Sequence, residues 1–221
     1  AMISHVIFDC DGVLIDSEKI SMTVDMALLA ENGIHLTETE MYLRFVGPTF
    51  EDMVAGLERE YGKTLPHDLA ARKDGMMLER YRRDLKPVPG VIPMLRQLAL
   101  PKSIGTNGPR DRALEALRLT GLAPFFGDRL ITYEDVKNPK PAPDVYQLAA
   151  RRAGFNPAHC LVVEDSVTGA TAALAAGCKV IGFTGVAHDP AAKARELKDL
   201  GVSHVIHDMG ELLAAISPVV A

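Results

Sequence analysis

The feature that most constrains the fold is a set of six short apolar runs, rich in β-branched residues, that alternate with helical patterns. The runs are Ser4–Asp9 (SHVIFD), Lys102–Thr106 (KSIGT), Arg129–Thr132 (RLIT), Cys160–Asp165 (CLVVED), Lys179–Phe183 (KVIGF) and Ser203–His207 (SHVIH). Continuous apolar runs of this length suit strands that are covered on both faces, as in a parallel sheet. The alternation therefore predicts a doubly wound α/β fold, in which ligands bind at the carboxyl ends of the strands.

One segment, from Asp16 to Leu85, breaks this alternation because it has helical periodicity without a convincing strand. We therefore predict an α/β core domain of residues 1–15 and 86–221, and a small all-helical cap domain of residues 16–85 inserted after the first strand. Within the insert, the residues expected to end helices or form turns are Gly33, Gly47 and Gly62.

Composition excludes several classes of function. The 221 residues are 48% apolar and carry a formal charge of −5, so there is no electrostatic case for a nucleic-acid partner. No apolar run approaches the roughly 20 residues of a membrane span, and the start of the chain has no basic-then-apolar signal pattern. Three cysteines without a close pair argue against a disulfide framework or a zinc site. We expect a soluble, cytoplasmic protein without a membrane partner, either a monomer or a weak homodimer.

Two aspartates, Asp9 and Asp11, follow the first apolar run directly. Residues i and i+2 of a strand share a face, and two carboxylates held this close would force one to keep its proton. A divalent cation removes that conflict, and Mg²⁺ prefers oxygen ligands with incomplete protein coordination. Gly12 permits a sharp turn next to a ligand. Taken alone, the same DCDG tetrapeptide also fits an ordinary turn at the end of a strand.

Other predicted strand ends carry further polar residues. Thr106 and Asn107 lead into a helix that begins around Pro109, an arrangement that suits an anion or a simple helix cap. Glu164 and Asp165 form a second acidic pair at a strand end, and acids are also common as caps.

A lysine, Lys140, stands in a stiff loop between two prolines, where it would ordinarily be solvated. Together with the polar strand ends it completes a set of two aspartates, a hydroxyl, an ammonium and a second acidic pair. Such a set provides a carboxylate nucleophile, ligands for phosphate oxygens and ligands for Mg²⁺, which phosphoryl transfer through an aspartyl phosphate requires.

At this point the chain resembles a known family. Over essentially its full length it is similar to the haloacid dehalogenase-like (HAD) superfamily, in the branch of β-phosphoglucomutase-like sugar-phosphate phosphatases. The segments that resemble the four family motifs are FDCDGVLIDSE, GTNG, KPAPDVY and VVEDSVTGATAALAAG, and the helical insert resembles the family's cap domain. The resemblance implies a cap that excludes water and selects the substrate.

The resemblance also implies roles for individual residues. Asp9 would attack the phosphorus, and Asp11 would protonate the leaving alcohol and then activate the hydrolytic water. Thr106 would hydrogen-bond the transferring phosphoryl group with Asn107 beside it, while Lys140 would neutralise its charge and orient Asp9.

The cofactor implied by the resemblance is Mg²⁺. Its ligands would be Asp9, Asp165 and the main-chain carbonyl of Asp11, with Glu164 in direct contact or next to it. The implied function is a Mg²⁺-dependent phosphatase acting on a small phosphomonoester, such as a sugar or sugar-acid phosphate.

Three alternatives stay open. A β-phosphoglucomutase-like phosphomutase has a histidine where this chain has Ser21 and a basic cap residue where it has Phe50, although Arg44 lies close by in sequence. A 2-haloacid dehalogenase uses one aspartate and no metal, which would leave Asp11, Glu164 and Asp165 redundant. A non-catalytic phosphate-binding module, such as a receiver-like phosphoacceptor, would lack Asp11 and the helical insert.

Overall fold

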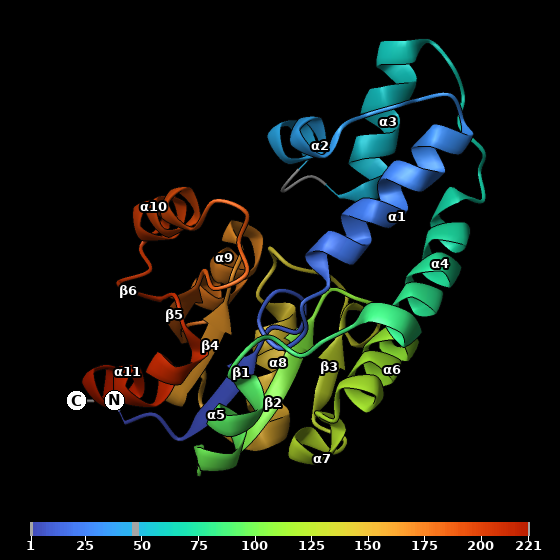
Figure 1. The fold of residues 1–221 in the computed structure, drawn as a ribbon. Coiled ribbons are helices and arrows are strands. Elements are labelled where there is room, and N and C mark those ends of the chain that lie inside the picture. The colour runs from blue at the N-terminus through green and yellow to red at the C-terminus, as the bar shows by residue number, and fades with distance from the viewer. Residues whose placement is uncertain (1, 46–48, 221) are drawn as a thin grey trace. The chain divides into compact units, whose positions relative to one another are not determined.

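A six-stranded, fully parallel sheet forms the centre of the structure, a computed structural model in which residues 2–45 and 49–220 are described (Figure 1). The strand order is β3-β2-β1-β4-β5-β6. The strands are His5–Phe8 (β1), Lys102–Thr106 (β2), Leu130–Thr132 (β3), Cys160–Glu164 (β4), Lys179–Phe183 (β5) and His204–Ile206 (β6). All six lie within the predicted apolar runs, and the predicted doubly wound α/β fold is confirmed.

Helices cover both faces of this sheet. They are α5 (Val91–Gln97), α6 (Arg110–Thr120), α7 (Ala123–Phe126), α8 (Asp144–Ala153), α9 (Val167–Ala175), α10 (Pro190–Leu200) and α11 (Leu212–Val220), with short 3₁₀ turns at Tyr133–Asp135, Pro157–His159 and Met209–Glu211. The connection through α5 leads from β1 to β2, and the connection through α8 returns from β3 to β4 in the opposite direction along the sheet. Because both crossovers are expected to be right-handed, these two helices lie on opposite faces (Figure 1).

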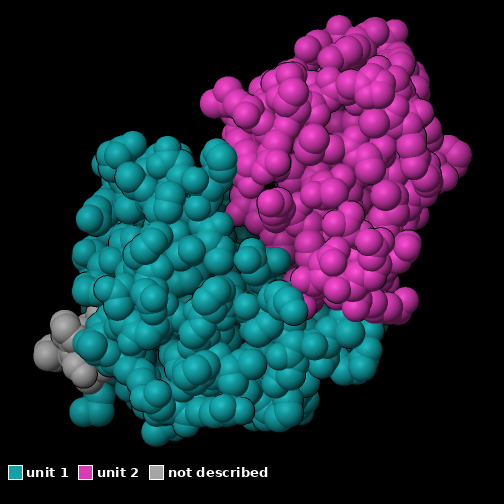
Figure 2. Space-filling model, viewed as in Figure 1, with its two compact units in different colours: residues 1–16, 86–221 teal, residues 17–85 magenta. Residues whose placement is uncertain are grey.

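The chain between the first strand and α5 forms a helical insertion. Residues 17–85 make one compact unit, and residues 1–16 with 86–221 make the other (Figure 2). The helices of the insertion are α1 (Glu18–Glu31), α2 (Glu38–Phe45), α3 (Phe50–Tyr61) and α4 (Leu69–Asp84). Gly62 ends α3 in a left-handed conformation, whereas the turn expected at Gly47 lies outside the described residues. Among the described residues, no helix has the length and apolar character needed to cross a membrane.

The insertion leaves and rejoins the α/β unit through a paired neck. The Asp16 N–H donates to the Lys86 carbonyl at 3.0 Å, and the Val88 N–H donates to the Leu14 carbonyl at 2.9 Å. Ile15 bridges Pro87 between these two hydrogen bonds. The two ends of the inserted segment are therefore held side by side on the α/β unit.

The central strands place the candidate site. β1 lies between β2 and β4, with Phe8 in register with Ile104 of β2 and Val163 of β4. The order of strands reverses direction between β1 and β4, and a crevice for ligands is expected at the carboxyl ends of strands at such a point. The predicted site residues at the first, second and fourth strand ends therefore all come to this part of the sheet.

Candidate active site

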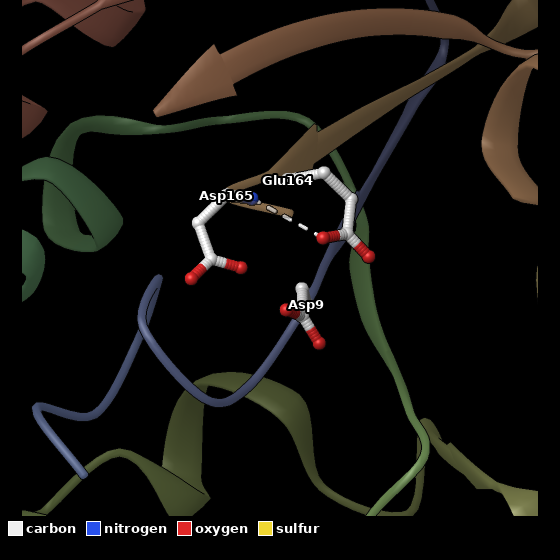
Figure 3. Close-up of side chains that lie close together, drawn as sticks. All are labelled: Asp9, Glu164 and Asp165. Carbon is white, nitrogen blue, oxygen red and sulfur yellow. Dashed lines mark hydrogen bonds between the residues drawn. The ribbon is translucent and has the colours of Figure 1, made fainter. Parts of the chain in front are cut away.

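Three carboxylates meet where β1 and β4 end. The Asp9 N–H donates to the carbonyl of Val163 at 3.1 Å, which continues the sheet pairing and sets Asp9 beside Glu164, the last residue of β4. Asp9, Glu164 and Asp165 each offer an oxygen, and these oxygens lie within 4.8 Å of one another. Figure 3 shows the three side chains turned toward one another, with the Asp165 N–H donating to Oε2 of Glu164 at 3.2 Å.

Lys140 joins two of these acids. Its Nζ donates to Oδ1 of Asp9 at 3.0 Å, to Oε1 of Glu164 at 2.8 Å and to the carbonyl of Gly105 at 2.8 Å. Only 7% of the residue is exposed. A lysine between prolines is thus almost fully enclosed rather than solvated, and its three ammonium hydrogens are all directed at oxygen atoms.

The electrostatics of this group follow from burial. Burial raises the pKa of Asp9 from its ordinary value of 3.8 to about 7; repulsion from Glu164 adds to the rise and Lys140 opposes it. Burial also acts against the charged form of Lys140, but Asp9 and Glu164 outweigh it and hold the pKa of the ammonium above its ordinary value. The site therefore holds more negative than positive charge and favours a further cation.

The donor set fits Mg²⁺. Hard carboxylate oxygens with room for water or substrate oxygens are what this ion prefers, and all three acids converge from different positions on two adjacent strand ends. A cation near them would oppose the burial penalty that raises the pKa of Asp9. Asp9, Glu164 and Asp165 are thus suited to hold the metal that the sequence predicts.

Asp11 lies in the tight loop that follows β1. The Gly12 N–H donates to the Ile15 carbonyl at 2.9 Å, and Gly12 has φ +79°. A Cβ at this position would lie 2.1 Å from Oδ2 of Asp165, so glycine is required both by the backbone and by the space that Asp165 occupies. The loop thereby brings the acidic ends of β1 and β4 together.

The loop after β2 lies next to Asp11. A Cβ placed on Gly108 would lie 3.4 Å from Oγ1 of Thr106 and 3.7 Å from Oδ2 of Asp11, so the hydroxyl and the carboxylate flank the same glycine. Oγ1 of Thr106 also accepts from the Gly108 N–H at 3.0 Å. A predicted phosphate-binding hydroxyl and a predicted acid–base group thus share one neighbourhood.

Asn107 has an arrangement that its sequence position did not predict. Its Oδ1 accepts from the Lys140 N–H at 2.9 Å, and its Nδ2 donates to the Lys140 carbonyl at 3.1 Å. The side-chain amide therefore fastens the main chain of the lysine loop to the loop after β2. The role expected for Asn107 beside the phosphoryl group stays a prediction.

Tyr146 is a site residue that the sequence analysis missed. It lies on α8 and is fully buried, and its hydroxyl donates to Oε1 of Glu164. Burial, followed by the charges of Glu164 and Asp9, raises the pKa of the phenol well above its ordinary value, so the hydroxyl stays protonated. The only available signal was its place in the segment KPAPDVY, three residues after a proline-rich loop whose path the sequence does not give.

Comparison with known proteins agrees with this geometry. A family model described as haloacid dehalogenase-like hydrolase matches residues 3–177. The 6-phosphogluconate phosphatase of Escherichia coli K12 is 29% identical over 188 residues, which cover 85% of this chain and 85% of that protein.

Two solved structures are also similar. A conserved haloacid dehalogenase-like protein of unknown function from Agrobacterium tumefaciens is 36% identical, with a TM-score of 0.89 and coverage of 99% of this chain and 100% of that one. A HAD-family hydrolase from Deinococcus radiodurans, solved with bound phosphate and sodium, is 34% identical, with a TM-score of 0.82 and coverage of 99% and 96%. The resemblance inferred from the sequence is confirmed: the chain belongs to the haloacid dehalogenase-like hydrolases.

Proposed function

We propose that this chain is a Mg²⁺-dependent phosphatase that hydrolyses a small phosphomonoester, a sugar or sugar-acid phosphate, through an aspartyl phosphate on Asp9. The observation that carries the proposal is the buried ammonium of Lys140, which bridges Asp9 and Glu164 at the carboxyl end of the central strands. The phosphate class is supported by the relative that acts on 6-phosphogluconate and by the similar hydrolase with bound phosphate.

The first half-reaction would transfer the phosphoryl group to the protein. A carboxylate oxygen of Asp9 attacks phosphorus, the bond from phosphorus to the alkoxide oxygen breaks, and Asp11 gives its proton to that oxygen so that a neutral alcohol leaves. The hydroxyl of Thr106 donates a hydrogen bond to an oxygen of the transferring phosphoryl group, while the ammonium of Lys140 offsets the negative charge of that group and orients Asp9. Asp9, Asp165 and Glu164 would hold Mg²⁺, which would supply positive charge to offset the charge of the phosphoryl oxygens.

The second half-reaction would regenerate the protein. Asp11, now ionised, removes a proton from a water molecule, whose oxygen attacks phosphorus and releases inorganic phosphate and the carboxylate of Asp9. The sum is ester plus water giving alcohol plus phosphate, with both aspartates restored to their starting protonation states. One acid–base group serves both steps because it gains in the second the proton that it lost in the first.

The test is phosphate release from a panel of sugar phosphates, sugar-acid phosphates and nucleotides, with Mg²⁺ or EDTA. Turnover that needs Mg²⁺ and disappears in Asp9→Asn is expected, whereas Asp128→Asn, an exposed residue before β3, should match wild type. No release from any ester, with isomerised sugar phosphates appearing once a bisphosphate is added, would replace the phosphatase with a mutase.

A second measurement isolates Asp11. A p-nitrophenyl ester needs no proton on its leaving oxygen, so Asp11→Asn should still form the phosphoenzyme but hydrolyse it slowly. The phosphoenzyme accumulates, and mass spectrometry after an acid quench detects the phosphoryl group on the peptide that contains Asp9. If no phosphorylated peptide accumulates while phosphate is still released, the covalent route through Asp9 is wrong.

A further inference from the structure

Tyr146 contacts both charged groups that organise the site, although nothing in the mechanism above uses it. Its hydroxyl donates to Oε1 of Glu164, and Nζ of Lys140 lies 4.7 Å from the centre of its ring. We propose that Tyr146 is a positioning residue that fixes the orientation of Glu164 for Mg²⁺ and holds Lys140 against Asp9. The inference deepens the proposed function and rests on it.

The phenol determines how the two oxygens of Glu164 are used. Oε1 receives the ammonium of Lys140 at 2.8 Å and the hydroxyl of Tyr146, which together occupy both of its lone pairs. Oε2 receives the Asp165 N–H at 3.2 Å and the more distant Ser166 hydroxyl at 3.5 Å. Both hydrogen bonds to Oε2 are longer than the one from Lys140 to Oε1, so we assign Oε2 as the oxygen that would bind a metal, and the phenol helps to hold Oε1 in its place beside Lys140.

The surroundings of Glu164 restrict its carboxylate to few orientations. The side chain is 0% exposed, and a Cβ on Gly169 of α9 would lie 1.9 Å from Oε1. α9 thus approaches the carboxylate so closely that only glycine fits, while the hydroxyl of Tyr146 reaches it from α8. Because the carboxylate is confined on these sides, the hydrogen bond from Tyr146 acts on a group that is already nearly fixed, and it selects among few orientations.

The ring of Tyr146 has a separate effect on Lys140. A Cβ on Gly105 would lie 2.9 Å from Cε1 of Tyr146, so the ring packs directly against the main chain of β2. The carbonyl of Gly105 also accepts from Nζ of Lys140 at 2.8 Å. The ammonium is thus held between the face of the ring and the end of β2, in a position where cation–π attraction adds to its hydrogen bonds.

A purely structural function for Tyr146 makes a different prediction. Phenylalanine would fill the same volume in the core and would retain the ring beside Lys140, but it would remove the donor to Glu164. If Tyr146 only packs, Tyr146→Phe changes the unfolding temperature and leaves metal binding as it was. If Tyr146 positions Glu164, the same variant weakens metal binding, because partners of metal ligands typically contribute about 10- to 100-fold to affinity.

The experiment measures Mg²⁺ binding by calorimetry to the substrate-free wild type, to Tyr146→Phe and to Tyr133→Phe. Tyr133 is 42% exposed and serves as the matched control. We expect the Mg²⁺ dissociation constant to rise at least about tenfold in Tyr146→Phe alone. At saturating Mg²⁺, KM for the phosphoester should stay within about twofold, because Tyr146 contacts protein groups and not the substrate, while kcat falls.

Thermal unfolding of each variant in EDTA supplies the structural readout, and binding is measured well below the lowest midpoint. An unchanged Mg²⁺ dissociation constant in Tyr146→Phe would overturn the inference, even if phosphate release by the wild type supports the proposed function. If the variant binds Mg²⁺ more weakly but the wild type hydrolyses no phosphoester, the positioning of Glu164 is supported and the proposed phosphatase function is overturned. A wild type that binds no Mg²⁺ would overturn both.

Discussion

The ammonium of Lys140 lies 3.0 Å from Oδ1 of Asp9, although 131 positions separate the two residues in the chain. This contact ties the loop before α8 to the end of β1, and both side chains are largely buried. Without its partner, either side chain would bury a charge that lacks a counterion, which is strongly unfavourable. The pair therefore links the stability of the fold to the chemistry of the proposed nucleophile.

Replacing Lys140 with methionine tests this link. The variant keeps the length of the side chain but leaves Asp9 and Glu164 without their shared cation, and loss of one partner of a buried pair costs about 3–5 kcal/mol. We expect a loss of unfolding free energy of that order in urea at pH 8 and a fall in kcat of at least about 100-fold. A smaller loss of stability is expected at low pH, where Asp9 takes up a proton. Equal stability of variant and wild type at pH 8 would contradict the assigned contact.

The raised pKa of Asp9 predicts a pH dependence of stability in the absence of metal. The pKa is about 7 in the folded protein against an ordinary 3.8, because burial and Glu164 disfavour the charge. The folded state then binds more protons than the unfolded chain between these values, so the contribution of Asp9 to the free energy of unfolding falls as the pH rises through this window. Asp9→Asn removes the effect. In EDTA, the free energy of unfolding of the wild type minus that of the variant should therefore decline as the pH rises from about 4 to 7.

The same shift predicts proton release when Mg²⁺ binds. The metal favours ionised Asp9, so binding near pH 6 should release part of a proton, and binding well above pH 7 should release none. Calorimetry in two buffers with different ionisation enthalpies measures the number of protons directly. A pH-independent value of zero would mean that Asp9 is already ionised in the metal-free protein.

Gly12 allows a comparison between strain and steric clash. Gly12→Ala forces a side chain into a conformation at φ +79° and places its Cβ 2.1 Å from Oδ2 of Asp165. Gly121→Ala imposes similar backbone strain at φ +75° with nothing within 4 Å. Both variants should lose about 1–2 kcal/mol in urea unfolding from the left-handed backbone. Only Gly12→Ala should also weaken Mg²⁺ binding. Equal Mg²⁺ affinities in the two variants would show that the side chain of Asp165 can move aside without loss of metal binding.

Asn107 provides a test of how the lysine loop is held. Asn107→Asp keeps the acceptor for the Lys140 N–H but replaces the donor to the Lys140 carbonyl with a second oxygen, so one hydrogen bond becomes a repulsion. We expect kcat to fall by roughly 10-fold or more as the ammonium shifts from Asp9, which corresponds to about 1.4 kcal/mol. Asn156 caps a short turn before β4, and Asn156→Asp is the control. This variant should match wild type in steady-state kinetics. If the two variants turn over equally, the clamp on Lys140 has no part in catalysis.

The sequence predicted the strand ends better than it predicted the contacts between loops. Thr106 and Glu164 were identifiable because each closes an apolar run, and strand ends in a parallel sheet gather at one edge. The amide of Asn107 on the main chain of Lys140, 33 positions away, has no local signature. In the sequence, Gly169 is one of several small residues in a helical segment, and only the structure shows that the carboxylate of Glu164 occupies the space that a Cβ at this position would need.

The paired neck at Asp16 and Lys86 has a consequence for how such a chain can change over time. The main-chain hydrogen bond between them holds the two ends of the insertion together, so the inserted segment forms a closed loop whose ends are a fixed distance apart. The entropic cost of closing a loop grows only with the logarithm of its length, about 0.6 kcal/mol for each doubling. Changes in the length of the inserted segment therefore add little to the entropic cost of joining its two ends, and the neck keeps these ends in place beside β1.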